Sequence, residues 1–197
     1  MNTEIQIMEK PDWVSWDDIH NVVWKAHENN RKKGIMMAYP SLSSEKIKNI
    51  VGKGKLFVAI NDDKVVGTLA LIKKTLKKWY CNGDCGYLCF GAVLPEYSGK
   101  GIYRSLYQLA EFTAKQMKLS VLTRDTNEHN ARMLRITKQE GYCFVDYRVC
   151  KDHYNIVRAK WLNGCPYSEA YCKYQFLLHK WYKKLRYKPN RGKRFGL

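Results

Sequence analysis

The stretch "GYLCFGAVLPEYSGKGIYRSLYQLAEFTAKQMK", residues 86–118, carries three structural signals in a row. An apolar run ends at Pro95, two glycines follow at Gly99 and Gly101, and an amphipathic pattern over 101–117 predicts a helix. The amides of a helix N-terminus have no internal acceptor and carry the positive end of the helix dipole, and glycine lets the backbone approach a ligand. The stretch therefore predicts a strand, an anion-binding turn that fits a pyrophosphate, and a helix.

This turn matches neither of the two common phosphate-binding motifs. It lacks the G-x-x-x-x-G-K-[ST] pattern of a P-loop, and a dinucleotide fingerprint would need glycine in place of Arg104. Taken alone, the two glycines leave open a tight strand-to-helix turn that binds nothing.

Regular elements are predicted on both sides of the turn. An S-x-x-D capping box begins the first helix, and a serine and a glycine bound a short second helix. Two β-rich runs around "NDDK" predict an antiparallel hairpin, and "CNGDC" at 81–85 is interpreted as a turn before a strand. The order of elements predicts a mixed sheet in an α/β domain. The expected strands are 55–60, 64–72, 86–94, 119–123 and 142–149, and the expected helices lie within 15–33, 41–51, 101–117 and 130–139.

The composition favours a globular protein with its own core. The chain has 197 residues, of which 45% are hydrophobic. Its N-terminus has no apolar run after a basic start, and no run of about 18 apolar residues occurs, so we expect neither a signal peptide nor a spanning helix. A cytoplasmic location is the resulting expectation.

Seven cysteines are scattered along the chain without a C-x-x-C pair. This spacing is typical of reduced thiols rather than of a zinc or redox motif. We therefore expect no metal.

Charge is distributed unevenly. Lys and Arg number 35 against 18 Asp and Glu, for a net charge of +17. Residues 148–197 contain thirteen Lys or Arg and only Asp152 and Glu169 as acids. An anionic partner is expected at this end, and nucleic acid, an anionic membrane, an acidic carrier protein and a phosphorylated ligand all fit. A basic solubilising tail is the alternative.

Residues 161–197 form a predicted C-terminal extension that follows a domain over 1–160. Within it, 167–185 has the periodicity of an amphipathic helix with lysines on its polar faces. A helix that packs on the domain is one interpretation, and a helix at an anionic membrane surface is the other. Nucleic acid is not expected, because no recognised nucleic-acid motif accompanies the charge. One face of the expected helix carries Tyr171, Tyr174, Leu178, Trp181 and Leu185.

Over about residues 50–150 the sequence resembles the GCN5-related N-acetyltransferase (GNAT) superfamily. The resemblance rests on the order of elements, on V-x-PEY-x-GKGI at 93–102, and on Asn130 placed eleven residues before Gly141-Tyr142. It implies an α/β fold with a mixed, mostly antiparallel twisted sheet flanked by helices, to which this chain adds a basic C-terminal helical extension.

The family's Q/R-x-x-G-x-G/A loop falls on Ser98 to Tyr103, and only the central Gly101 matches it outright. Ser98 replaces a long polar side chain and Tyr103 replaces a small residue, but main-chain donors remain. The resemblance implies acetyl-CoA as co-substrate, with the loop amides on its pyrophosphate and the main chain of the preceding strand on its pantetheine and thioester carbonyl. It also implies that Asn130 contacts the pantetheine, alongside a role in capping its helix. The implied binding residues are Ala92, Val93, Leu94, Ser98, Gly99, Lys100, Gly101, Ile102, Tyr103 and Asn130.

The sequence indicates the catalytic residues less clearly than the binding residues. Thr137 stands where the family often has a tyrosine that protonates the departing thiolate, and a threonine hydroxyl is shorter and much less acidic. The strand over 87–94 offers no carboxylate to take a proton from the attacking amine. Glu96 is the nearest acid in sequence, and His153 and Tyr154 follow the last expected strand.

The resemblance implies an N-acetyltransferase that moves an acetyl group from acetyl-CoA to a primary amine, and we expect an amino sugar or another small amine as first-choice acceptor. A protein or peptide acceptor and an acyl-carrier-bound donor are the enzymatic alternatives. The non-enzymatic alternative is a module that uses the same fold to bind RNA or an acidic partner. A peripheral contact with an anionic membrane through the C-terminal extension is the further partner that we expect.

Overall fold

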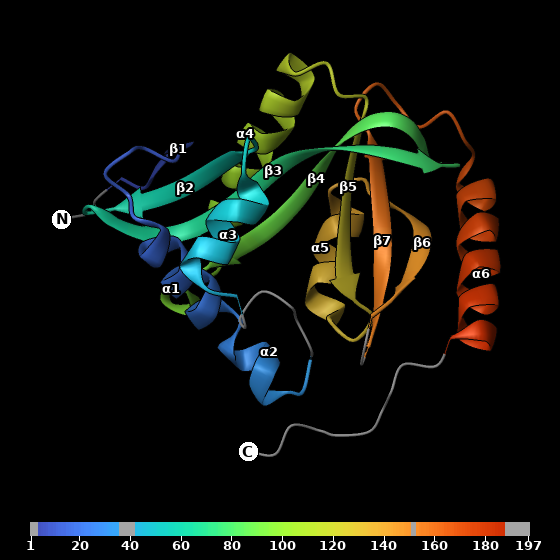
Figure 1. Ribbon diagram of the computed structural model, residues 1–197, viewed down its shortest axis with the longest axis horizontal. Helices are drawn as coiled ribbons and strands as arrows, with labels where there is room; N and C mark the ends of the chain where they lie inside the picture. Colours follow the sequence, from blue (N-terminus) through green and yellow to red (C-terminus); the bar gives the residue numbers. More distant parts are fainter. Residues whose placement is uncertain (1–3, 36–41, 151–152, 188–197) are drawn as a thin grey trace.

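A seven-stranded sheet organises the chain in the computed structural model, which describes residues 4–35, 42–150 and 153–187 (Figure 1). The strand order is β1-β2-β3-β4-β5-β7-β6. The strands are β1 (Gln6–Glu9), β2 (Lys55–Asn61), β3 (Lys64–Lys78), β4 (Cys81–Val93), β5 (Val121–Asn127), β6 (Cys143–Val149) and β7 (Tyr154–Trp161). The helices are α1 (Trp16–Ala26), α2 (Glu28–Lys32), α3 (Ser44–Val51), α4 (Ile102–Gln116), α5 (Ala131–Gln139) and α6 (Glu169–Arg186). The predicted mixed, mostly antiparallel sheet is confirmed.

One parallel pair interrupts an otherwise antiparallel sheet. β1 to β4 pair antiparallel in sequence order, and β5, β7 and β6 form a second antiparallel group. The two groups meet where β4 and β5 run parallel. A parallel neighbour needs a crossover connection, and α4 supplies it.

Helices cover both faces of the sheet. α1 and α3 lie on one face, and α4 and α5 lie on the other (Figure 1). Gly67 of β3 makes room for α4, because a Cβ there would lie 3.1 Å from Ile102 and 3.2 Å from Leu106. The main core fills both sides of the β2–β4 region, with Ile19 and Val23 of α1 fully buried. About 0.8 kcal/mol per buried CH₂ makes these layers the main source of stability.

β4 carries a bulge in its second half. Thr68 pairs with Ala92, whereas Ala70 pairs with Cys89, so β4 has one extra residue between the two pairs. Phe90 adopts a left-handed φ of 52°, and its carbonyl accepts a hydrogen bond of 2.7 Å from the buried hydroxyl of Thr68. The bulge bends β4 just before the strand reaches Pro95.

α6 stands beside the edge strand β6 at the right of Figure 1. Cys172 and Phe176 are its buried residues, and the Phe176 ring lies 5.4 Å from that of Phe144 in β6. Lys183 adds an ion pair of 2.8 Å to Asp146. The helix packs through these residues. On the predicted face, Tyr174 and Trp181 are 61% and 65% exposed, whereas Tyr171 is 41% exposed and contacts the Trp79 ring at 5.6 Å between centroids.

Several expectations need correction. "CNGDC" is not a turn but the beginning of β4, because Asp84 is held across the hairpin by Thr75 at 2.7 Å and Lys73 at 2.6 Å. The first helix is divided at His27, whose ψ of 3° ends α1 before α2 begins. Strands β1 and β7 were not predicted. The sequence of β7 lacks a clear strand pattern, because the charged residues Arg158 and Lys160 lie among its apolar residues.

Among residues 4–35, 42–150 and 153–187, no helix is both long and apolar enough to cross a membrane. The tail beyond Tyr187, to which much of the predicted basic charge belongs, lies outside the described residues. The division of the chain at residue 160 stays a prediction.

Candidate active site

The site begins where β4 and β5 part. The two strands are in register at two positions only, Gly86 with Leu122 and Tyr87 with Thr123. β4 then continues to Val93 and β5 to Asn127 without further registered pairs between them, and Figure 1 shows the two strands diverging. A parallel pair that opens in this way leaves β4 backbone groups turned toward the gap, where they are available to a ligand.

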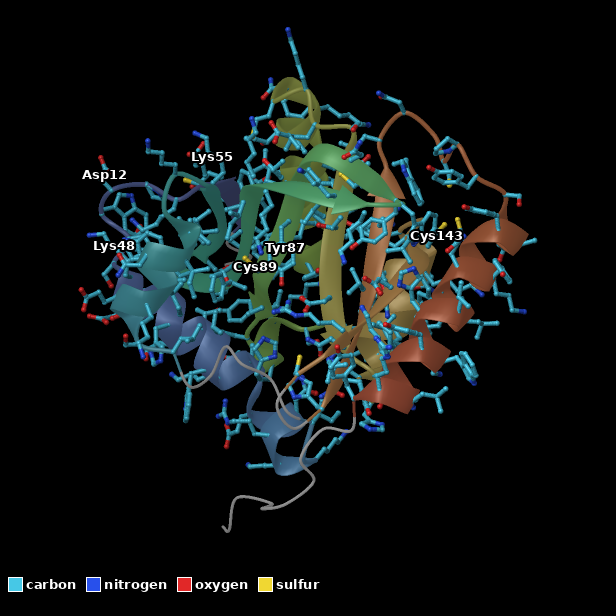
Figure 2. All side chains as sticks on the ribbon, turned by 45° about the vertical axis from the view of Figure 1, so that its right-hand side comes forward. Asp12, Lys48, Lys55, Tyr87, Cys89 and Cys143 are labelled. Carbon is cyan, nitrogen blue, oxygen red and sulfur yellow. The ribbon has the colours of Figure 1, made fainter. Side chains whose placement is uncertain are left out.

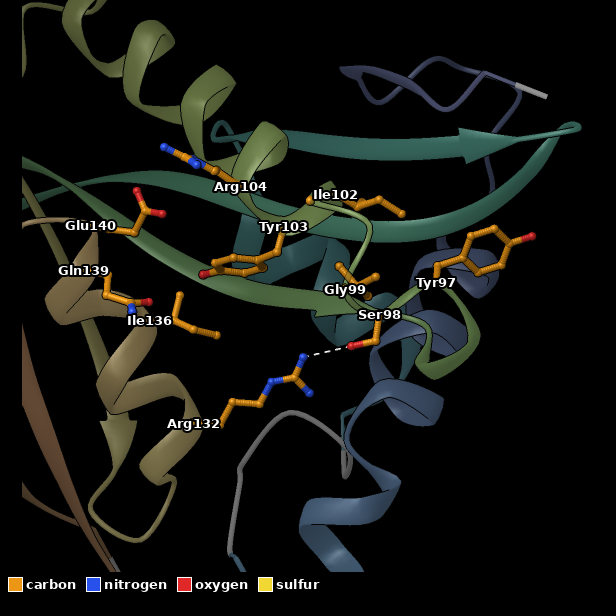
Figure 3. A pocket seen from close by; sticks show the side chains of 12 residues that line it. Tyr97, Ser98, Gly99, Ile102, Tyr103, Arg104, Arg132, Ile136, Gln139 and Glu140 are labelled. Atoms are coloured by element: carbon orange, nitrogen blue, oxygen red, sulfur yellow. Dashed lines mark hydrogen bonds between the residues drawn. The ribbon is translucent and has the colours of Figure 1, made fainter. Parts of the chain in front are cut away.

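A cavity of about 430 Å³ lies at the open end of this gap, between α4 and α5 (Figure 3). Its walls come from the end of β4, the loop that follows, the first turn of α4 and the length of α5. The residues that line it are Val93, Tyr97, Ser98, Gly99, Gly101, Ile102, Tyr103, Arg104, Arg132, Ile136, Gln139 and Glu140. Six of the ten predicted binding residues are therefore brought together here: Val93, Ser98, Gly99, Gly101, Ile102 and Tyr103.

The loop has the backbone of an anion site. A short 3-10 helix, Pro95–Tyr97, leads into Gly99 at φ 85° and Gly101 at φ 77°, the residue before α4. A Cβ at either glycine would meet no atom within 4 Å. Gly101, the N-cap residue of α4, has no side chain that could cap the first turn. Because Gly101 and the first-turn residues Ile102 to Arg104 line the cavity, the amides there are candidate anion donors.

Basic side chains surround this loop. Arg132, in the first turn of α5, donates a hydrogen bond of 2.8 Å to the Ser98 hydroxyl, drawn as a dashed line in Figure 3. Arg104 is exposed in the first turn of α4, and the Lys100 ammonium lies 4.9 Å from the Tyr97 ring centroid. The positive potential of these groups favours a phosphorylated ligand.

Tyr103 points into the cavity rather than away from it (Figure 3). Its ring covers β4 at Gly91, where a Cβ would lie 3.0 Å from the ring. Its hydroxyl accepts a hydrogen bond from the buried Arg124 of β5, so the side chain spans the gap from α4 to β5. Arg158 pairs with Arg124 across the strands, and burial together with that neighbouring charge lowers the pKa of Arg158 to about 9.

The opposite face of the sheet carries a second polar group at the narrow end of the gap. Tyr87 of β4 donates a hydrogen bond of 2.5 Å to Asp125 of β5. Arg148 and Asn155 donate to the other oxygen of the same carboxylate at 2.9 Å and 3.0 Å. The Asp125 side chain is only 6% exposed, and the Lys74 ammonium lies 3.5 Å from the Tyr87 ring centroid.

Asp125 was not predicted, because a carboxylate was sought only in the strand expected over 87–94. Asp125 comes from β5, which runs to Asn127 and not to 123 as expected. The sequence does contain a signal for the polar end of this strand. In 123–127, "TRDTN", five consecutive polar residues continue an apolar strand. Four of the five are buried, which is unusual for polar side chains without a function or a partner.

The other predicted residues lie outside the cavity lining. Asn130 caps α5, accepting a hydrogen bond of 3.2 Å from the Met133 amide, and Lys100 is exposed on the loop. Ala92 and Leu94 are buried in β4 and just beyond it, and the Leu94 amide already donates to Val66 at 2.9 Å.

The structure does not bring the four predicted catalytic residues together. Thr137 is fully buried and donates to the Met133 carbonyl at 2.8 Å within its own helix. Glu96 is exposed on the loop, 4.0 Å from Lys64. His153 precedes β7, and Tyr154 begins that strand and donates to the Tyr187 carbonyl at the end of α6.

Comparison with known proteins bears on this geometry. The family model for the acetyltransferase (GNAT) family matches residues 16–142. No curated protein matches the sequence significantly.

Solved structures share the fold at low sequence identity. An acetyltransferase from Streptococcus agalactiae is 20% identical with a TM-score of 0.62, covering 80% of this chain and 98% of its own. A GNAT family acetyltransferase from Elizabethkingia anophelis, solved with acetyl-CoA bound, is 14% identical with a TM-score of 0.60, covering 80% and 97%. The ribosomal-protein-S18-alanine N-acetyltransferase of Escherichia coli is 15% identical with a TM-score of 0.62, covering 81% and 94%.

Proposed function

The chain belongs to the acetyltransferase (GNAT) family, and from this membership we propose that it transfers an acetyl group from acetyl-CoA to a primary amine. An amino sugar or another small amine is the first-choice acceptor. The observation that carries the proposal is the gap between β4 and β5, which has an anion-binding loop at its open end and a Tyr87–Asp125 pair at its narrow end.

The residues at the open end fit coenzyme A. A pyrophosphate needs close backbone approach and donors, and Gly99, Gly101 and the amides at the start of α4 offer both. Arg132 and Arg104 add positive charge. Acetyl-CoA supplies an activated thioester when bound. β4 amides that face the gap are the donors that we assign to its carbonyl oxygen, where negative charge develops.

At the narrow end, Tyr87 and Asp125 are placed to take a proton from the acceptor amine. An amine is protonated near neutral pH and must lose a proton to attack. In the proposed step the Tyr87 oxygen accepts a proton from the ammonium while the Tyr87 proton passes to the Asp125 carboxylate along their 2.5 Å hydrogen bond. Arg148 and Asn155 hold the carboxylate in this orientation.

Protonation of the leaving thiolate is assigned to solvent. Thr137 is buried and its hydroxyl is engaged within α5, so it is a poor proton donor to the gap. Placement of both reactants in one gap can contribute roughly 7–11 kcal/mol without an acid from the protein.

An acceptor screen tests the proposal. The purified chain is mixed with acetyl-CoA and with amino sugars, polyamines, amino acids or peptides with free N-termini, and free coenzyme A is followed with a thiol reagent. We expect coenzyme A release that depends on a small amine and is highest for an amino sugar. Release only with peptides would overturn the acceptor assignment, and binding of acetyl-CoA without release by any amine would support the non-enzymatic alternative.

We further propose that α6 lies at an anionic membrane surface. Its exposed stripe joins Tyr174, Leu178, Trp181 and Leu185, which are 61%, 44%, 65% and 63% exposed. Helix α6 packs on β6 through other residues, so this stripe is free to meet a bilayer. Tyr and Trp favour the membrane interface, and the exposed Lys173 and Arg186 of the same helix add positive charge for anionic lipid, whereas Lys183 and Lys184 pair with Asp146 and Glu128.

A further inference from the structure

Three cysteines that are distant in sequence meet where α6 joins the sheet. Cys143 begins β6, Cys165 lies in the connection between β7 and α6, and Cys172 lies in the first turns of α6. Their three sulfur atoms all lie within 4.8 Å of one another. Figure 2 shows sulfur atoms gathered beside the label of Cys143, next to α6.

Packing accounts for two of these thiols but not for the third. Cys172 is buried and Cys143 is half-buried, as expected of small apolar side chains at the contact between α6 and the sheet. Cys165 is exposed and gains nothing from packing. The connection is nevertheless bent so that Cys165 returns to the other two, with Gly164 at a φ of 91° before it and Pro166 after it. Tyr167 also holds this connection against Trp79 and Trp161, so it is the convergence of the three sulfurs, rather than the bend, that points to a shared ligand.

We propose that Cys143, Cys165 and Cys172 bind one zinc ion through their thiolates. Zinc holds thiolates at about 2.3 Å in a tetrahedron, which places pairs of sulfurs about 3.8 Å apart. Sulfurs that already lie within 4.8 Å reach this spacing by small side-chain rotations. Three thiolates leave the fourth position of the tetrahedron for a water or another external ligand.

The proposed ion would link three segments of the fold. It joins β6, the connection after β7 and α6, three segments that otherwise meet through side-chain packing and the Lys183–Asp146 ion pair. This junction fixes the orientation of α6 and hence of its exposed stripe. The site lies outside the cavity between α4 and α5, so it is independent of acetyl transfer.

Zinc binding at this site releases protons. Because zinc binds the thiolates, its affinity increases as the pH rises. Tyr167, two residues after Cys165, contacts Trp79 and Trp161 at 5.4 Å and 5.8 Å between ring centroids, and these tryptophans provide a fluorescence signal for the connection.

The test uses the full chain, reduced and freed of metal. Zinc is titrated in competition with a chromophoric chelator, and Co²⁺ is added separately as an optical probe of thiolate coordination. Cys165→Ser is the main variant, because an exposed side chain can be changed without loss of fold, and Cys150→Ser is the matched control outside the cluster. Thermal unfolding confirms that both variants fold.

We expect one zinc per chain, a thiolate-to-cobalt charge-transfer band, and a change in tryptophan fluorescence on binding. Cys165→Ser should weaken zinc binding more than about 100-fold, and Cys150→Ser should leave it unchanged. No stoichiometric zinc binding by the reduced chain would overturn the proposal. Equal affinity in Cys165→Ser and wild type, or a disulfide within the cluster in the freshly purified protein, would do the same.

Discussion

Replacement of Gly101 by valine is the perturbation that examines the loop most sharply. Gly101 has a φ of 77°, and a Cβ there would contact no atom within 4 Å. The folded protein therefore suffers only the backbone strain of a left-handed residue, about 1–2 kcal/mol. For a chain of this size that is a decrease in Tm of roughly 2–8 °C.

The loss in ligand affinity has a different origin. The valine methyl groups would occupy the open space in front of the first amides of α4, and a pyrophosphate would lose at least one charge-assisted hydrogen bond. Such a bond is worth about 1.5–3 kcal/mol. We therefore expect Kd for acetyl-CoA to increase roughly tenfold to 150-fold.

Gly34→Val separates the two effects. Gly34 has a φ of 69°, also has no atom within 4 Å of its Cβ position, and follows α2 away from the cavity. Isothermal titration calorimetry with acetyl-CoA should show wild-type affinity for Gly34→Val and the expected loss for Gly101→Val, at similar decreases in Tm. Equal affinity in the two variants would refute the assignment of the loop to the pyrophosphate.

Three further predictions concern the proton path and the tail. Asp125→Asn should lower kcat about 10²- to 10⁴-fold with unchanged affinity for acetyl-CoA, because the amide keeps the shape of the carboxylate but cannot accept the proton; an unchanged kcat in steady-state assays would refute its role. Thr137→Ala should lower kcat less than tenfold, since no serious acid is removed, and a loss of several hundredfold at constant acetyl-CoA affinity would make that hydroxyl a participant. Removal of 188–197, which lies outside the described residues, should reduce sedimentation with anionic vesicles at low salt while acetyl-CoA affinity stays intact; if the intact chain does not sediment with such vesicles at low salt, the membrane proposal fails.

Much of the fold could be predicted because local signals agree with it. The Ser15–Asp18 capping box, the Ser43 cap of α3 and its end at Gly52 appear as the sequence predicts. The apolar runs of β2 and β3 are also where they were expected. The polar continuation of β3 through Lys73 to Lys78 could not be predicted, because it is largely exposed and its strand pairing comes from β4.

The candidate site also has one part that could be predicted from the sequence and one part that could not. The loop around Gly101 follows one continuous stretch of sequence, so its backbone conformation could be predicted from two glycines before a helix. Tyr87 and Asp125 could not be paired from sequence, because they are 38 residues apart and meet only through the parallel register of β4 and β5. The cysteine cluster could not be predicted from sequence either, because its three residues come from separate segments that meet only in the folded chain.

The most direct measurement of the central claim is a paired assay of product and coenzyme A. The chain is incubated with acetyl-CoA and each amine of the screen, and mass spectrometry of the acetylated amine is compared with the free thiol released. The account predicts equal amounts of both with at least one small primary amine, and a loss of both signals in Asp125→Asn. Acetyl-CoA binding with no acetylated product from any amine would contradict it.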